Sequence, residues 1–364
     1  MTNERGVHLF SPLTIKGITL RNRIGVSPMC QYSSTDGLLD DWHLVHLGSR
    51  AVGGAGLVIV EATGVEPRGR ISPGDSGLWN DQQANALARI ARFIKQQGAI
   101  PGIQLAHAGR KGSTAKPWDQ NGRSLGDQEG GWETIAPSPL AFGNEISRAP
   151  REMSEADIQQ VQKAFQEATI RALKAGCEWL ELHAAHGYLL HEFYSPLTNK
   201  RKDSYGGSFE NQIRMTLETA RTMREVWPDN LPFSVRLSCT DWVEGGWTIQ
   251  NSLELSRRLK AEGVDLIDCS SGFNTPDYSG IPFGAGFQVP FAERIRREAE
   301  ILTAAVGFIT DPMQADQIIR NGEADIVLLA REMLREPYWA LDAARQVHQK
   351  QAAPPPIQYG RAMD

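Results

Sequence analysis

The chain is poor in cysteine, and this absence narrows the class of protein to which it belongs. Its 364 residues include only four cysteines, and no two of them form a Cys-x-x-Cys pair. Structural zinc sites and iron–sulfur clusters commonly use such pairs, and small secreted domains need a denser disulfide framework. We therefore expect a protein of a reducing cytoplasm that holds neither a metal nor an iron–sulfur cluster.

The sequence also lacks the features of a protein that binds membranes or nucleic acids. No apolar segment approaches the roughly 20 residues needed to cross a bilayer. The first ten residues lack the apolar core of a secretion signal. The formal net charge is −5, so there is no excess of basic residues to bind phosphate backbones or anionic lipids. These absences predict a cytoplasmic globular protein without membrane or nucleic-acid partners.

What the sequence has is a regular alternation of short apolar segments with longer segments of helical periodicity. Several short segments are apolar on both faces, as in Leu-Val-Ile-Val at 57–60. Strands that are buried on both faces are typical of a parallel sheet covered by helices. The eight predicted strands are 24–28, 56–62, 101–106, 179–183, 233–237, 266–270, 301–306 and 326–330.

The segments between these strands carry signals of helix boundaries. The segment that begins at Ser154 resembles a capping box, followed by apolar residues at helical spacing. Pro312 occupies the first turn of another predicted helix, where its missing N–H does no harm. Gly98 and Gly263 follow two further helical segments and mark their ends.

Eight βα units of about 30 residues account for roughly 250 residues, the usual size of a (β/α)8 TIM barrel. We therefore predict a single α/β barrel domain over residues 1–364. The alternative is an open, doubly wound sheet in two domains. It is disfavoured because the glycine-rich segment at 53–56 precedes its strand, whereas a dinucleotide-binding turn follows one.

Three segments lie outside the eight βα units of the predicted barrel. Residues 1–22 would contain a β-hairpin that plugs the bottom of the barrel. Residues 108–152 would form a long insertion after the third strand, on the face where TIM barrels carry their active sites. Residues 350–364 would form an extended C-terminal tail.

The end of the fourth predicted strand is the most informative candidate site. His183 lies on the strand, and His186 and Tyr188 follow it. If the neighbouring leucines face the helices, the twofold period of a strand directs His183 into the barrel. Gly187 permits a sharp turn immediately afterwards. Two imidazoles and a phenol can therefore converge over the barrel mouth.

Two histidines three residues apart have other interpretations. They could be metal ligands, or one could be a hydrogen-bonded core residue. Nearby carboxylates offer no obvious third ligand, because Glu181 would lie one layer deeper in the barrel. A pair of neutral donors to a substrate oxygen explains the arrangement better.

The ends of the last two strands predict a phosphate site. Gly307 follows the seventh strand, and Ala330 and Arg331 follow the eighth. Loops at these positions commonly bind phosphate in TIM barrels, and a guanidinium matches phosphate geometry. Arg331 could instead be a surface charge. Many aldolases and isomerases have the same pocket, so it does not identify a reaction by itself.

The segment at 181–189, Glu-Leu-His-Ala-Ala-His-Gly-Tyr-Leu, is the densest part of a wider resemblance. Together with further matching segments, the chain resembles the old yellow enzyme family of flavin barrels. It is most similar to the thermophilic-like branch, which includes bacterial xenobiotic reductases. The resemblance extends from Phe10 to Arg361, and the other matching segments are 21–23, 27–32, 104–110, 132–138 and 193–208.

The resemblance implies bound FMN, with NADPH or NADH as co-substrate. Cys30 would tune the flavin potential, and Arg236 would face the part of the ring that becomes negative on reduction. The residues implied to bind FMN are Ser27, Pro28, Met29, Cys30, Ala62, Gln104, Arg236, Gly307, Ala330 and Arg331.

The resemblance further implies an ene-reductase for enones, maleimides or nitro compounds, acting by hydride transfer from flavin N5 in a ping-pong cycle. His183 and His186 would bind the carbonyl or nitro oxygen, and Tyr188 would protonate the α-carbon. The implied catalytic residues are Tyr188, His183, His186 and Cys30, and Tyr32 and Arg361 are implied to contact substrate. The chain would form a homodimer or homotetramer, with Arg361 reaching a neighbouring subunit.

Three other functions are compatible with a flavin or phosphate barrel. Relatives that act on dienoyl-CoA or amines add a cysteine-rich cluster motif, which this sequence lacks. A non-catalytic sensor of FMN or phenols would keep Arg236 and Arg331 but would not need Tyr188. An aldolase or isomerase acting on a phosphorylated metabolite would need a reactive lysine or a paired base, and no predicted strand end carries a lysine.

Overall fold

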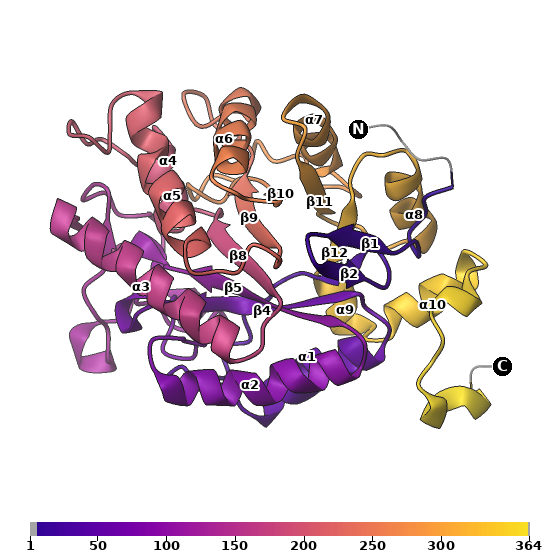
Figure 1. The fold of residues 1–364 in the computed structure, drawn as a ribbon. Coiled ribbons are helices and arrows are strands. Elements are labelled where there is room, and N and C mark those ends of the chain that lie inside the picture. The colour runs from indigo at the N-terminus through magenta and orange to yellow at the C-terminus, as the bar shows by residue number, and fades with distance from the viewer. Residues whose placement is uncertain (1–5, 363–364) are drawn as a thin grey trace.

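The computed structural model describes residues 6–362, so residues 1–5 of the predicted hairpin segment and 363–364 of the predicted tail lie outside the described residues. Eight parallel strands form a closed barrel, with helices around it (Figure 1). The fold is therefore the predicted (β/α)8 TIM barrel. In order around the barrel the strands are β3 (Ile24–Val26), β4 (Leu57–Gly64), β5 (Ile100–Ala106), β8 (Trp179–Ala184), β9 (Phe233–Ser238), β10 (Leu266–Ser270), β11 (Leu302–Val306) and β12 (Ile326–Leu329).

The alternation of side chains along β8 separates the two apolar layers of the barrel. Leu180 and Leu182 belong to the large cluster that includes the helices, whereas Trp179 belongs to a smaller cluster among the strands. Because consecutive side chains on a strand point to opposite faces, Glu181 and His183 share the inner face with Trp179. His183 therefore lies inside the barrel, as its position in the sequence predicts.

The helices begin and end where the sequence signals indicate. The Ser154 hydroxyl accepts a hydrogen bond from the Asp157 amide at 3.1 Å and caps α3. Pro312 begins α8, and Gly98 and Gly263 lie just beyond α2 and α6. The helices are α1 (Asp41–Val52), α2 (Asp81–Gln96), α3 (Glu155–Lys174), α4 (Leu189–Tyr194), α5 (Phe209–Arg224), α6 (Ile249–Ala261), α7 (Val289–Glu298), α8 (Pro312–Arg320), α9 (Arg331–Arg335) and α10 (Trp339–Gln346).

The predicted N-terminal hairpin closes the bottom of the barrel. Strands β1 (Leu13–Ile15) and β2 (Ile18–Leu20) pair antiparallel. Ile15 and Leu20 are buried in the inner cluster, together with Leu57 at the start of β4. The hairpin therefore fills the end of the barrel opposite to the carboxyl ends of the strands.

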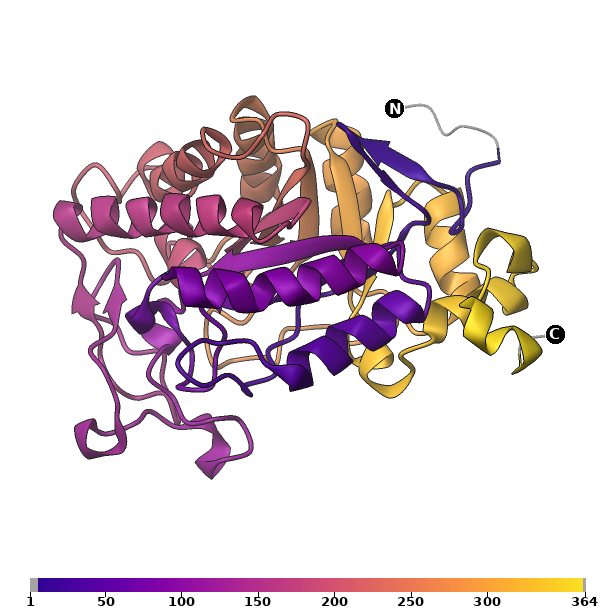
Figure 2. The ribbon, with the colours of Figure 1, turned by 60° about the horizontal axis from the view of Figure 1, so that its bottom comes forward.

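The insertion after β5 and the C-terminal tail extend from opposite sides of the molecule (Figure 2). The insertion contains the short strands β6 (Ile135–Ala136) and β7 (Arg151–Glu152), which pair in parallel. The tail differs from the extended segment that we predict, because it forms two 3₁₀ turns, η5 (Lys350–Ala352) and η6 (Ile357–Ala362). The rings of Tyr359 and Tyr338 are in contact, with their centres 6.0 Å apart, and this contact favours the compact form.

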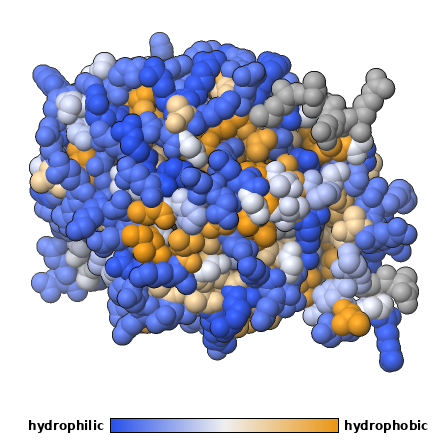
Figure 3. Space-filling model, in the orientation of Figure 1, coloured by the Kyte–Doolittle hydropathy of each residue, from blue (hydrophilic) through white to orange (hydrophobic). Residues whose placement is uncertain are grey.

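The face seen in Figure 3 is mostly hydrophilic, with apolar side chains in scattered patches. Among the described residues, no helix combines the length and apolar character that crossing a membrane would require.

Candidate active site

The predicted imidazole pair and phenol meet at the carboxyl end of β8. The ring centres of His183 and His186 are 5.2 Å apart, and those of His183 and Tyr188 are 5.0 Å apart. Both pairs meet edge to face, with planes at 88° and 89°. In each pair the edge of one ring meets the face of the other, so the three polar side chains are packed together at this strand end.

The His183 imidazole is a neutral donor. Burial, reinforced by the positive charge of Arg236, holds its pKa well below the usual range. The Ala185 amide donates to Nδ1 of His183 at 3.2 Å, so this nitrogen carries a lone pair. The proton of His183 therefore lies on Nε2, where it can be donated to a ligand.

The His186 imidazole has the same character and a defined partner. Burial, followed by the charge of Arg236, also lowers its pKa well below the usual range. Its Nε2 atom lies 2.7 Å from the Ser270 hydroxyl, at the carboxyl end of β10. With the Ser270 hydroxyl as donor to Nε2, the proton of His186 lies on Nδ1, where it can be donated to a ligand.

Tyr188 keeps its proton and lies beside a lysine that we did not predict. Burial, followed by the neighbouring Cys30, raises the pKa of Tyr188 well above its usual range. The Lys111 ammonium lies 5.0 Å from the centre of the Tyr188 ring and donates to the His186 and Phe273 carbonyls at 2.8 and 3.2 Å. Lys111 follows β5 by five residues, so only a search beyond the strand ends would have found it.

The segment after β3 forms the opposite side of the mouth. Burial, followed by the charges of Asp75 and Glu61, raises the pKa of Cys30. The pKa of the neighbouring Tyr32 is raised first by burial and then by Cys30. Both side chains are therefore uncharged at neutral pH, like Tyr188.

Two pairs of buried polar side chains lie beneath the mouth, inside the barrel. Gln104 on β5 donates its amide to Glu181 at 2.9 Å. Arg236 on β9 approaches the buried Asp268 on β10, with Nε 3.0 Å from Oδ2. Burial raises the pKa of Asp268, while Arg236 opposes this effect. We did not predict Asp268, because a buried acidic residue on a strand gives no local signal of its partner.

A cavity of about 230 Å³ extends from Ser270 to the ends of β11 and β12. Gly307, Ala330 and Arg331, which the sequence predicts as a phosphate site, line its far end. A side chain at 307 would have its Cβ 2.8 Å from the Gln288 amide nitrogen, so glycine leaves this space open. The Arg331 guanidinium lies over the Phe308 ring at 4.7 Å and forms no ion pair with any residue between 6 and 362.

Comparison with known proteins identifies the family. The model of the NADH:flavin oxidoreductase / NADH oxidase family matches residues 8–350. The chain belongs to this family. The predicted membership of the old yellow enzyme family and the predicted flavin oxidoreductase are thereby confirmed.

Relatives in this family align with nearly the whole chain. An NADPH dehydrogenase of Geobacillus sp. (strain WCH70) is 48% identical over 93% of this chain and 94% of its own length. An NADPH dehydrogenase of Bacillus subtilis (strain 168) is 44% identical over 97% of this chain and 98% of its own.

Solved structures show the same fold. Morphinone reductase in complex with tetrahydroNAD has a TM-score of 0.77 at 24% identity, over 94% of this chain and 92% of that chain. The old yellow enzyme homologue of Zymomonas mobilis has a TM-score of 0.76 at 23% identity, over 94% of this chain and 92% of its own. At this level of identity the likeness concerns the fold alone.

The residues at the mouth fit the flavin mononucleotide of this family. The Ser27 hydroxyl at the end of β3 is buried and has no hydrogen-bond partner among residues 6–362, so it is available to a ligand. Arg236 and Arg331 could each meet a negative part of the ligand, one at the mouth and one at the far end of the cavity. Within the same described range, no group of three His, Cys, Asp or Glu side chains is arranged to hold a metal ion.

One predicted substrate contact lies apart from these residues. Arg361 is exposed in η6. The C-terminal segment that carries it extends beyond α10, away from the barrel (Figure 1).

Proposed function

We propose that the protein is an ene-reductase that uses NADPH, or NADH, to reduce carbon–carbon double bonds activated by carbonyl or nitro groups. Enones, maleimides and nitro compounds are the proposed substrates. The observation that carries the proposal is the pair of neutral imidazoles at the end of β8, beside the cavity that leads to Arg331. Two uncharged N–H donors suit an oxygen that becomes negative only during the reaction.

Bound FMN would accept hydride equivalents from the nicotinamide and supply them to the alkene. Arg236 is a buried cation beneath the mouth and would stabilise negative charge on the reduced ring. The ring would be held by Ser27, Pro28, Met29, Cys30, Ala62, Gln104 and Arg236, and the phosphate by Gly307, Ala330 and Arg331.

His183 and His186 would hold the carbonyl or nitro oxygen of the substrate. Their N–H groups would polarise the conjugated alkene and make its β-carbon electron-poor. Since the pKa of each imidazole is lowered by burial and then by Arg236, the donors stay uncharged and bind the transition state better than the ground state. A single donor of this kind is typically worth about 2.7–4 kcal/mol.

Tyr188 would deliver the proton that the substrate α-carbon needs. Its raised pKa keeps the phenol protonated until charge develops on the substrate, and a positioned general acid typically contributes roughly 10²–10⁴-fold. Tyr32 and Cys30 would contact the substrate from the opposite side of the mouth. Because Tyr188 serves only this step, its position favours an enzyme over a sensor that merely binds flavin.

We also propose a single-domain cytoplasmic protein that forms a homodimer or homotetramer. The exposed tail with Arg361 supports this proposal, because an arginine there could reach the mouth of a neighbouring subunit. The free thiols of Cys30, Cys177, Cys239 and Cys269 are compatible with a reducing compartment.

The imidazole pair can be tested directly. The purified protein should be yellow, and its flavin absorbance should bleach under NADPH without air. In a His183→Ala/His186→Ala double variant we expect 2-cyclohexenone reduction to fall by at least about 10²-fold, because two transition-state donors are lost. Flavin content should stay within about twofold. The exposed His348→Asn variant is the control and should match the unmodified protein.

Two results would end the proposal. One is a colourless protein that cannot be reconstituted with FMN. The other is unchanged turnover of 2-cyclohexenone in the double variant, because the imidazoles would then have no part in the reaction.

A further inference from the structure

Two consecutive left-handed residues connect the proposed oxygen donor to the proposed acid. His186 has φ +59° and Gly187 has φ +70°. A Cβ at 187 would lie 2.4 Å from the Phe273 carbonyl oxygen, so only glycine fits there. A non-glycine residue in this region, such as His186, stores about 1–3 kcal/mol of strain and persists only where its surroundings hold it.

Hydrogen bonds donated by three successive backbone amides hold this turn. The His186 amide donates to the Ser238 hydroxyl at 2.9 Å, and the Tyr188 amide donates to the Ala185 carbonyl at 3.1 Å. Between them, the Gly187 amide donates to Nδ1 of His191 at 2.9 Å. The middle bond is the only one of the three whose acceptor must be in a particular tautomer.

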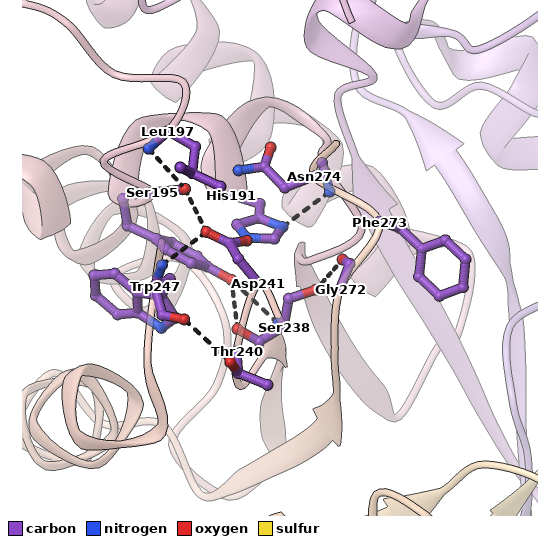
Figure 4. A network of polar contacts seen from close by, with 12 residues as sticks. His191, Ser195, Leu197, Ser238, Thr240, Asp241, Trp247, Gly272, Phe273 and Asn274 are labelled. Carbon is purple, nitrogen blue, oxygen red and sulfur yellow. Dashed lines mark hydrogen bonds and ion pairs between the residues drawn. The ribbon is translucent and has the colours of Figure 1, made fainter. Parts of the chain in front are cut away.

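His191 is oriented in turn by a buried carboxylate (Figure 4). Its Nε2 atom lies 2.8 Å from Oδ1 of Asp241, and neither side chain is exposed. The other oxygen of Asp241 accepts from the Ser195 hydroxyl at 2.6 Å and from the Trp247 amide at 2.8 Å. Both oxygens of this carboxylate are therefore committed, and its position is fixed by two segments of the chain.

These contacts determine which nitrogen of His191 carries the proton. Because the Gly187 amide is a donor, Nδ1 of His191 must hold a lone pair, and the proton must lie on Nε2. Asp241 accepts a hydrogen bond from that N–H group, as carboxylates do when they orient a histidine. Burial raises the pKa of Asp241, but His191 and its other donors lower it further, so the carboxylate remains ionised.

The pair could merely join α4 to the loop after β9. His191 also stacks on Tyr194, with ring centres 4.7 Å apart, which serves that structural purpose. However, a structural link would need only the bond to Asp241. The second bond, to Gly187, acts on the residue between His186 and Tyr188.

We propose that His191, oriented by Asp241, is a positioning residue that fixes the left-handed turn at His186 and Gly187 and so aims His186 and Tyr188 at the substrate. The inference rests on the proposed function for its effect on catalysis. Its effect on the turn itself is independent of that function.

Two substitutions of His191 each keep one of its two hydrogen bonds and remove the other. In His191→Asn the amide oxygen can replace Nδ1 and accept from Gly187, while the bond to Asp241 is lost. In His191→Gln the amide nitrogen can replace Nε2 and donate to Asp241, while the bond to Gly187 is lost. A purely structural role needs only the bond to Asp241 and therefore predicts that His191→Asn is the more disturbed variant, whereas the positioning role predicts the opposite order.

We expect the two variants to differ. Hydrogen exchange of the Gly187 amide should accelerate at least about tenfold in His191→Gln and by less than about threefold in His191→Asn, because only the latter keeps an acceptor. Flavin re-oxidation by 2-cyclohexenone should slow by about 10–100-fold in His191→Gln alone, since misplacement near 1 Å can have such an effect. Flavin reduction by NADPH should change less than about threefold in both.

Equal exchange rates in the two variants, or rate losses that follow only their melting temperatures, would overturn the inference. If His191→Gln does not fold, ¹⁵N-histidine spectra of the unmodified protein provide the test, with His191→Asn assigning the signal. The His191 resonance must show the proton on Nε2, and a proton on Nδ1 would refute the inference. Absence of enone reduction in the unmodified protein would instead refute the proposed function, while the exchange test would still decide the role of His191.

Discussion

At the scale of single residues, burial gives ordinary side chains the protonation states that the proposed reaction needs. It lowers the pKa of His183 and His186 and raises that of Tyr188, so all three are neutral donors in one space. In water near neutral pH an imidazole would be partly charged. The barrel mouth therefore changes the chemistry of these residues by removing water from them.

Replacing Tyr188, the proposed acid, tests this arrangement by removing one hydroxyl group. In Tyr188→Phe we expect oxidation of reduced flavin by 2-cyclohexenone to slow by roughly 10²–10⁴-fold, because no phenol proton reaches the α-carbon. Flavin reduction by NADPH should remain nearly intact, since that step needs no proton from Tyr188. Anaerobic stopped-flow absorbance would measure the two half-reactions separately. Equal losses in both would show that Tyr188 is not the acid.

At the scale of elements, the sequence pattern of the N-terminal hairpin predicts the same buried face that the hairpin packs against the barrel. The alternation in β1 and β2 predicts which side chains face inward, and the barrel supplies the surface that they cover. Leu20 is wholly buried there, whereas Thr19 is exposed. The hairpin therefore contributes to stability although it lies far from the proposed chemistry.

Removing the Leu20 side chain should measure that contribution. We expect Leu20→Ala to lower the free energy of unfolding by about 2–5 kcal/mol, through lost apolar burial and the cavity left behind. Thr19→Ala, on the exposed face, should change it by less than about 1 kcal/mol. Urea denaturation followed by circular dichroism would give both values. Similar small effects for the two variants would mean that the hairpin does not seal the barrel.

At the scale of the whole molecule, the barrel buries carboxyl groups that affect its stability as pH changes. Glu61, on β4, accepts from the amide of Gln31, the residue that follows Cys30, at 3.2 Å. Burial raises the pKa of Glu61 from its ordinary 4.5 to about 8. The native state therefore holds a proton between these values that the unfolded chain releases.

It follows that stability should fall as pH rises from about 5 to 8. Over this window Glu61 makes the free energy of unfolding decrease by up to about 1.4 kcal/mol per pH unit. Glu61→Gln keeps the acceptor for Gln31 and cannot ionise, so we expect a flatter dependence on pH. Denaturation of both proteins at pH 5, 6, 7 and 8 would measure the slopes. Parallel slopes would show that Glu61 does not retain its proton in the native state.

Much of this molecule follows from patterns that are local in the sequence. All eight barrel strands, the hairpin, the Ser154 cap and the start of α8 at Pro312 are recognisable because each depends on neighbours within a few residues. The convergence of His183, His186 and Tyr188 is local in the same sense, since one strand end and one turn carry all three. The family resemblance extended these patterns to residues that local signals alone would not have selected.

Only the tertiary structure decided which distant groups act on that turn. Ser270 meets His186, Lys111 covers Tyr188, and Asp241 orients His191, although these partners lie 84, 77 and 50 residues apart in the chain. Periodicity records whether a side chain faces inward, but not which residue it meets across a closed barrel. That choice depends on strand register and loop path, which the chain acquires only when the barrel closes.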